Sequence, residues 1–167
     1  MRKQKGFSLI ELMIVVAIIL IIAAIAIPNL LRARIAANDS SAAAGERTIV
    51  NGEVTYITTY PGIGYAILSS LGGAATPCVS GTTNACVIDN NLATNGGGAG
   101  KSGYNFAVTV AAGPPPTFFT TAAPLSNQTG AKSFCASPDG VLRSQPAGTI
   151  TAIGTYAGCA GLNPIAN

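Results

Sequence analysis

Few residues of this chain carry reactive groups, and their types exclude several kinds of catalytic site. The sequence contains no histidine, so no Ser–His or Cys–His pair can activate a nucleophile. The glycine cluster at residues 95–100 lacks the Gly-Lys-Ser/Thr ending of a phosphate-binding loop. We expect Glu46, Glu53, Asp89 and Asp139 to be solvated or turn residues rather than a catalytic pair. Asp89 and Asp139 could contribute to a calcium site, but one carboxylate in each loop is too few to assert one. We predict a protein that is not an enzyme and has no metal site or cofactor.

The cysteines indicate disulfide bonds. There are four, Cys78, Cys86, Cys135 and Cys159, and an even number in an exported region is typical of an oxidising compartment. No CxxC spacing supports a zinc site. Three pairings are possible, and loop length favours the two shortest, Cys78 with Cys86 and Cys135 with Cys159.

A different chemistry is indicated near the N-terminus. Gly6 is small and flexible, so a protease could hold the chain extended before Phe7. Cleavage between Gly6 and Phe7 would remove three basic residues, Arg2, Lys3 and Lys5, and would create a charged amine on Phe7. The remaining six basic residues then balance six acidic ones, so we predict no specific nucleic-acid site.

Glu11 is the one ionisable side chain between Phe7 and Ile27. An acid at the centre of a membrane helix costs about 2.5–3.5 kcal/mol, and less near its end. The Phe7 amine of a second copy of this chain would remove this cost, and we hypothesise that such a pair sets the register between copies. The alternative is that Glu11 lies at the headgroup level and is solvated.

The element that carries these residues is an apolar helix. Leu12–Ile27 is a run of sixteen apolar residues, and the helix from Phe7 would span roughly 30 Å, the thickness of a bilayer core. The preceding basic residues favour a cytoplasmic location for that end. Pro28 removes a backbone hydrogen bond, so we expect a kink or local melting near it.

The helical pattern continues to about Tyr60, where Pro61 and Gly62 end it. Gly45 and Gly52 weaken this half by about 1 kcal/mol each, so packing on a sheet must stabilise it. A stripe of apolar residues is expected to make that contact: Leu31, Ile35, Ala42, Ile49, Val50, Val54 and Ile57.

Beyond this helix, short apolar runs between Gly, Pro, Asn and Ser clusters predict an antiparallel sheet. The expected strands are Tyr104 to Val110, Thr117 to Ala122, Lys132 to Ala136 and Val141 to Arg143, with a turn at Ser137 to Gly140. No internal repeat is evident.

The basic residues, Gly6 and "FSLIEL" leading into the apolar run resemble the N-terminus of type IV pilins and of the pseudopilins of type II secretion. The resemblance is close over residues 5–31. It implies cleavage after Gly6 by a prepilin peptidase, methylation of the Phe7 amine, and an assembly role for Glu11. It also matches Pro28 to the family's helix-breaking proline, and the pair Cys135 and Cys159 to the cysteines that bracket a C-terminal loop.

The resemblance predicts an α+β pilin fold in which a long helix packs on a small antiparallel sheet. The expected parts are a leader (1–6), a membrane and filament-core helix (7–28), an amphipathic half-helix (29–61) and a β-rich region (62–167). The implied function is a structural subunit that leaves the inner membrane to form a homo-oligomeric helical filament outside the cell. Its implied partners are the prepilin peptidase and the pilus assembly platform with its motors, and its implied outputs are adhesion, twitching motility or DNA uptake.

Three alternatives stay open at this point. The first is a pseudopilin of a type II secretion system, which shares the N-terminal motif. The second is a secreted protein with an ordinary signal peptide cut before Ile27, because Ala24-Ile25-Ala26 is an acceptable cleavage site. The third is a membrane-anchored protein of another class.

Overall fold

The computed structural model describes residues 7–73, 77–111, 113, 115–145 and 153–165. The chain divides into two compact units, Met1–Arg34 and Ile35–Asn167, and α1 (Leu9–Thr59) supplies residues to both. The other elements all belong to the second unit: α2 (Leu68–Leu71), α3 (Asn90–Ala93), the 3-10 helix η1 (Gly96–Gly98), β1 (Tyr104–Ala111), β2 (Thr117–Pro124), β3 (Phe134–Ala136), β4 (Arg143–Ser144) and α4 (Tyr156–Ala160).

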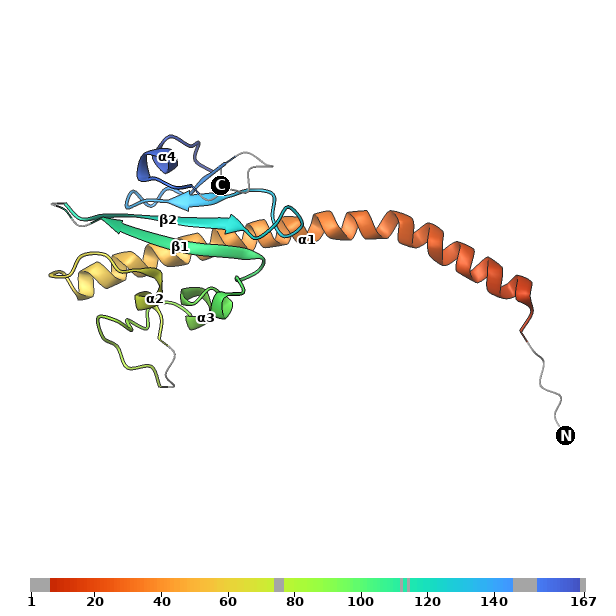
Figure 1. The fold of residues 1–167 in the computed structure, drawn as a ribbon, viewed down its shortest axis with the longest axis horizontal. Helices are drawn as coiled ribbons and strands as arrows, with labels where there is room; N and C mark the ends of the chain where they lie inside the picture. Colours follow the sequence, from red (N-terminus) through yellow and green to blue (C-terminus); the bar gives the residue numbers. More distant parts are fainter. Residues whose placement is uncertain (1–6, 74–76, 112, 114, 146–152, 166–167) are drawn as a thin grey trace. The chain divides into compact units, whose positions relative to one another are not determined.

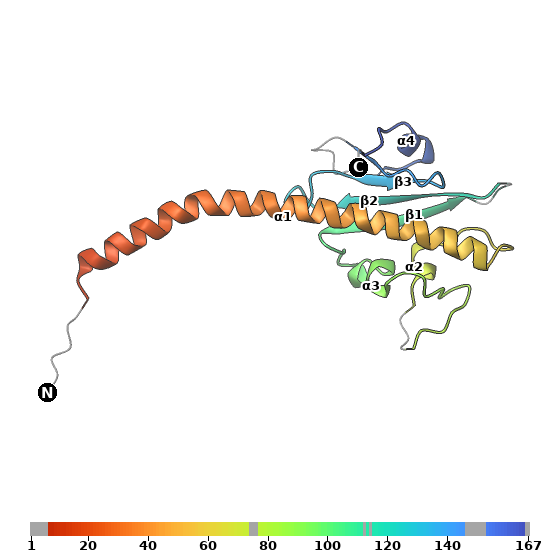
Figure 2. The ribbon, with the colours of Figure 1, turned by 180° about the vertical axis from the view of Figure 1, so that it is seen from behind.

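The four strands form one antiparallel sheet in the order β1-β2-β3-β4. The C-terminal part of α1 packs on this sheet, as Figure 1 and Figure 2 show from opposite sides. The α+β prediction is therefore confirmed, and each predicted strand has a counterpart. The last strand begins two residues later than predicted, because the Val141 N–H donates to Asp139 and keeps Val141 in the turn.

One face of α1 makes the core contact, and it repeats every seven residues. Ala42, Ile49 and Tyr56 are all buried, since seven residues are nearly two turns of helix. The predicted stripe is right for Ala42, Ile49 and Val50 but wrong for Leu31 and Val54, which are 51% and 50% exposed. Val54 lies about 120° around the helix from Ala42, so it points away from the sheet.

Two glycines let other segments approach α1 closely. A Cβ on Gly45 would lie 2.8 Å from a ring carbon of Phe106 in β1, and one on Gly52 would lie 2.8 Å from the Ile88 side chain. Each is followed by a glutamate, so a Gly-Glu pair occurs twice at a seven-residue spacing. This short repeat marks two positions where other segments approach α1 closely.

The short helices were not predicted, although their caps leave a signal. The Asp89 side chain accepts a hydrogen bond from the Leu92 N–H at the start of α3, and Thr155 accepts one from the Gly158 N–H at the start of α4. Asp and Thr are common in this capping position. α2 and α3 lie close to each other, whereas α4 contacts β2.

A polar contact joins α1 to the loop before β3. The hydroxyl of the buried Tyr104 lies 2.5 Å from Asp39 Oδ1 and 2.8 Å from the Lys132 carbonyl oxygen. The same Asp39 oxygen accepts the Ala131 N–H at 3.0 Å. Asp39 thus accepts hydrogen bonds from within the second unit, Ile35–Asn167, which we call the globular unit.

Candidate functional site

The candidate site is the start of α1. Gly6 lies outside the described residues, and Phe7, the first described residue, is 83% exposed. The Ser8 N–H donates to Glu11 Oε2 at 2.9 Å, and the Leu12 N–H donates to the Ser8 carbonyl at 3.3 Å. The carboxylate therefore satisfies one of the backbone N–H groups that a helix start leaves without a partner.

This contact is one half of a capping box, in which a glutamate three residues after Ser or Thr bonds back to its backbone. The spacing Ser8-x-x-Glu11 in the sequence is the signal for this contact. The structure adds a local role, because an acid at a helix N-terminus also interacts favourably with the helix dipole. The predicted contact of Glu11 with another subunit is a separate matter and stays a prediction.

The apolar residues that follow Glu11 are exposed. By length and composition this helix can cross a membrane, and its most apolar window is not buried at all within the described chain. The core helix of a soluble protein would be mostly covered by its own chain. The apolar half of α1 therefore needs a cover from outside the chain, either lipid or other polypeptides.

Pro28 lies inside α1, which is assigned as helix on both sides of it. The proline has no N–H, so the hydrogen bond that would close on the Ala24 carbonyl cannot form. The sequence predicted either a kink or local melting of the helix near Pro28. Melting is not observed, because the helix continues on both sides of the proline. A kink at Pro28 stays a prediction.

Two acids of α1 correct a sequence-based expectation. Glu46 and Glu53 were expected to be solvated, but both are fully buried. Glu46 Oε2 accepts from the Thr120 hydroxyl of β2, and Glu53 Oε2 accepts from the Ala66 N–H at 2.9 Å. The periodicity of apolar residues alone does not reveal these two carboxyl groups on the buried face.

Asp89 is engaged by local partners. Besides capping α3, it pairs with Lys101 at 3.1 Å, and the hydrogen bond from Lys101 holds the pKa of its carboxyl below the usual range. Its carboxylate is therefore part of the loop structure.

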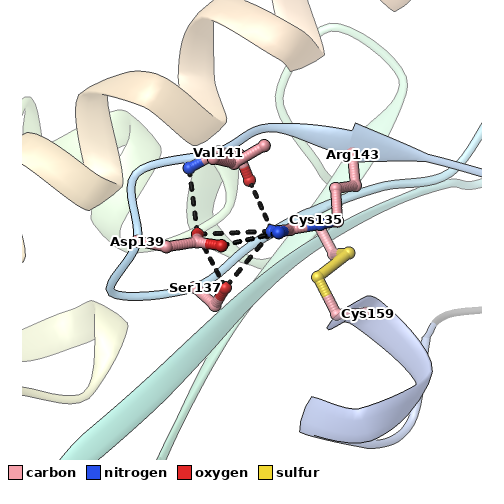
Figure 3. Close-up of polar contacts among 6 residues, drawn as sticks. All are labelled: Cys135, Ser137, Asp139, Val141, Arg143 and Cys159. Atoms are coloured by element: carbon pink, nitrogen blue, oxygen red, sulfur yellow. Dashed lines mark hydrogen bonds and ion pairs between the residues drawn. A yellow bond between two sulfur atoms is a disulfide. The ribbon is translucent and has the colours of Figure 1, made fainter. Parts of the chain in front are cut away.

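Asp139 organises the turn between β3 and β4, as Figure 3 shows. Both of its oxygens accept from the Arg143 guanidinium, at 2.6 and 3.2 Å, and the Ser137 hydroxyl and Val141 N–H also donate to it. The bond from Arg143 lowers the pKa of Asp139 to about 2. Among the described residues, no group of three or more His, Cys, Asp or Glu side chains could hold a metal ion.

The structure pairs Cys78 with Cys86 and Cys135 with Cys159, with Cα–Cα distances of 6.2 and 5.9 Å. This is the pairing that loop length favoured. Cys135 and Cys159 are fully buried and join β3 to α4 (Figure 3). Cys78 is exposed and Cys86 is half-buried, on a loop whose Thr82 carbonyl accepts the Tyr56 hydroxyl of α1 at 2.8 Å.

Comparison with known proteins gives two matches. Residues 1–27 match the model of the prokaryotic N-terminal methylation motif. A stretch of 40 residues is 68% identical to the type IV wide pilus major component PilA4 of Thermus thermophilus. The resemblance to type IV pilins is confirmed.

The similarity to this pilin covers 24% of the present chain and 30% of the relative. No solved structure matches the chain. Gly6, Phe7 and Glu11 all lie within the methylation-motif match.

Proposed function

We propose that this chain is the repeating structural subunit of a type IV pilus. The observation that carries the proposal is the exposed apolar surface of α1, which lies within the match to the methylation motif. The apolar surface of α1 can be covered first by lipid and later by other copies of the helix. Lipid of the inner membrane covers it in the precursor and the subunit pool, and other copies of the same helix cover it in the extracellular filament.

Processing would prepare the subunit for this exchange. The basic leader stays on the cytoplasmic side, the prepilin peptidase cuts between Gly6 and Phe7, and the new amine of Phe7 is methylated. Cleavage removes the leader charges and keeps the apolar anchor. The subunit then awaits extraction by the assembly platform and its motors.

Burial of apolar surface would drive assembly. Once α1 leaves the lipid, each Å² of apolar surface removed from water contributes about 25 cal/mol. Large aliphatic side chains occupy most positions of Leu9–Ile27 and are about half to three-quarters exposed. Bundling of these helices is therefore strongly favoured over exposure to water.

Glu11 would select the register in the bundle. Its Oε2 accepts the Ser8 N–H of its own chain, and a carboxylate has a second oxygen that can accept from the Phe7 amine of a neighbouring copy. The two roles are compatible, since one oxygen starts the helix and the other receives the neighbour. Apolar burial alone does not distinguish one sliding position from another, whereas a charge pair in an apolar surrounding does.

The first test is the mass of the mature chain. A chain that begins at N-methylated Phe7 supports the proposal. A chain that begins at Ile27 would support an ordinary signal peptide and overturn it, because the apolar segment would then be lost.

The second test separates the two roles of Glu11 by replacing it with glutamine. Glutamine can still accept the Ser8 N–H, but it cannot pair with a charged amine. We expect Glu11→Gln to insert in the membrane normally and to be absent from filaments, because breaking a buried charge pair costs about 3–5 kcal/mol. Fractionation of membranes and sheared fibres measures both, and normal filament incorporation of this variant would contradict the charge-pair role.

A third test separates a pilus from a secretion pseudopilus, which shares the N-terminal motif. Deletion of the gene should remove surface fibres from shear fractions and impair adhesion, twitching motility or DNA uptake. Normal fibres together with a loss of protein secretion would instead assign the chain to a type II secretion system.

A further inference from the structure

Two carboxyl groups are buried between α1 and the rest of the globular unit. Glu46 and Glu53 lie outside the apolar half of α1, seven residues apart on the same face, and neither side chain is exposed. For each, one oxygen accepts a single hydrogen bond, whereas Oε1 has no hydrogen-bond partner among the described residues. A buried carboxylate normally requires a cation or several donors.

The groups around these two carboxyls supply little positive charge. Glu46 faces the Thr120 hydroxyl, which itself lies 3.4 Å from the Ala136 carbonyl oxygen. Glu53 faces the backbone of Ala66 and, one turn along the helix, the Tyr56 hydroxyl, whose pKa it helps to raise.

Two cations of the described region pair with acids elsewhere: Lys101 with Asp89, and Arg143 with Asp139. The groups that donate hydrogen bonds to the two buried carboxyls are the Thr120 hydroxyl and the Ala66 N–H, and both are neutral.

We propose that Glu46 and Glu53 act as a proton-dependent latch: as neutral acids they join α1 to β2 and to the loop before α2, and loss of their protons releases this packing. The neutral form requires no counter-charge, so it fits the enclosed surroundings. The ionised form must recruit water, and water reaches Glu46 only if α1 separates from β2. This latch belongs to the globular unit and does not depend on whether the chain forms a pilus.

The direction of the pH dependence follows from burial. Burial raises the pKa of Glu46 to about 8 and that of Glu53 to about 7, and the hydrogen bonds from Thr120 and Ala66 lower each by less. The folded state therefore holds protons that the unfolded chain releases near pH 4.5. Stability from these groups is fully present below pH 4.5 and is lost as the pH rises through 7 and 8.

The experiment measures thermal and denaturant unfolding of the full chain in detergent micelles across this pH range. Between the unfolded and folded pKa values, each group raises the unfolding equilibrium constant about tenfold per pH unit. We expect this slope in the wild type and its loss in Glu46→Gln/Glu53→Gln, since glutamine keeps the shape and does not ionise. Asp139→Asn is the matched control. The hydrogen bond from Arg143 lowers the pKa of Asp139 to about 2, so its replacement should leave the slope above pH 4.5 unchanged.

Infrared spectroscopy keeps the proposal testable if the double variant does not fold. The variant Glu11→Gln removes the one acid of the apolar half of α1. An ordinary carboxyl group is ionised near pH 6, about two units above its pKa. A neutral-carboxyl band in this variant at that pH must therefore come from the globular unit. We expect the band there and its disappearance as the pH passes through the range of 7 to 8. Absence of the band near pH 6, or an unchanged pH slope in a folded double variant, would overturn the latch.

Discussion

Glu11 accepts a backbone hydrogen bond at the exposed start of α1, whereas Glu46 and Glu53 lie buried further along the same helix. The difference lies in what surrounds each carboxyl group. The Glu11 carboxyl is exposed and accepts the Ser8 N–H at the start of the helix. At the two buried positions, one neutral donor each is too little to favour ionisation. Residue type alone therefore does not define the role of an acid in this chain.

Gly45 lies where the Phe106 ring approaches α1 closely, and its replacement tests this packing. Alanine improves helix propensity by about 1 kcal/mol, but its Cβ would lie 2.8 and 2.9 Å from two ring carbons of the buried Phe106. Overpacking of this kind costs about 1–3 kcal/mol. We expect Gly45→Ala to lower the free energy of unfolding by about 1 kcal/mol, measured by denaturant unfolding of the full chain in detergent.

Gly62→Ala is the control, because nothing lies within 4 Å of a Cβ at that position. Its effect should stay within about 0.5 kcal/mol. A Gly45→Ala variant as stable as the wild type would show that β1 can move away from α1 without cost.

The two disulfides connect different parts of the fold. Cys135–Cys159 attaches α4 to the inner strand β3 and is fully buried, whereas Cys78–Cys86 closes a surface loop. Loop-closure entropy alone predicts similar contributions, about 2.6 kcal/mol for the shorter loop and about 3.5 kcal/mol for the longer one. Accessibility, rather than loop length, is therefore the property that separates them.

We predict that mild reduction opens Cys78–Cys86 before Cys135–Cys159, because a thiolate must reach a sulfur atom to attack it. Alkylation at increasing reductant concentration, followed by peptide mass analysis, measures the order. The variant Cys78→Ser/Cys86→Ser should show no labelling in the low-reductant range. Earlier or simultaneous labelling of Cys135 and Cys159 would contradict the prediction.

At the scale of the whole molecule, the chain combines a unit that folds on its own core with a helix that has none. The unit Ile35–Asn167 contains the sheet, both disulfides and the buried residues of α1. The apolar half of α1 contributes no buried residue. The two parts therefore differ in what they need from their surroundings.

We predict that a chain beginning at Asn29 is a soluble monomer without detergent, whereas the mature chain beginning at Phe7 requires detergent or assembles. Light scattering after size-exclusion chromatography measures both. Glu11→Gln in the mature chain is the control and should still require detergent, because its apolar surface is unchanged. A mature chain that stays monomeric in water would show that the globular unit covers the helix.

Features that depend on composition and local order are predictable from the sequence alone. An uninterrupted apolar run, a preceding basic leader and a single acid are visible without any structure, because membrane affinity depends on residue type along one helix. The strand positions also followed from local patterns, since Gly, Pro and Asn clusters interrupt extended runs wherever they occur. The predicted antiparallel sheet and the long helix were right for this reason.

Which side chains of α1 are buried, and which residues they contact, depends on how the rest of the chain folds against the helix. Val54 and Glu53 are neighbours in sequence, yet the valine is half-exposed and the glutamate is buried. Hydrophobicity predicts the opposite, because it takes no account of the Ala66 N–H that a later loop brings to Glu53. Contacts between residues distant in sequence, such as Thr120 with Glu46, arise from the folding of the sheet against α1, and no local pattern contains them.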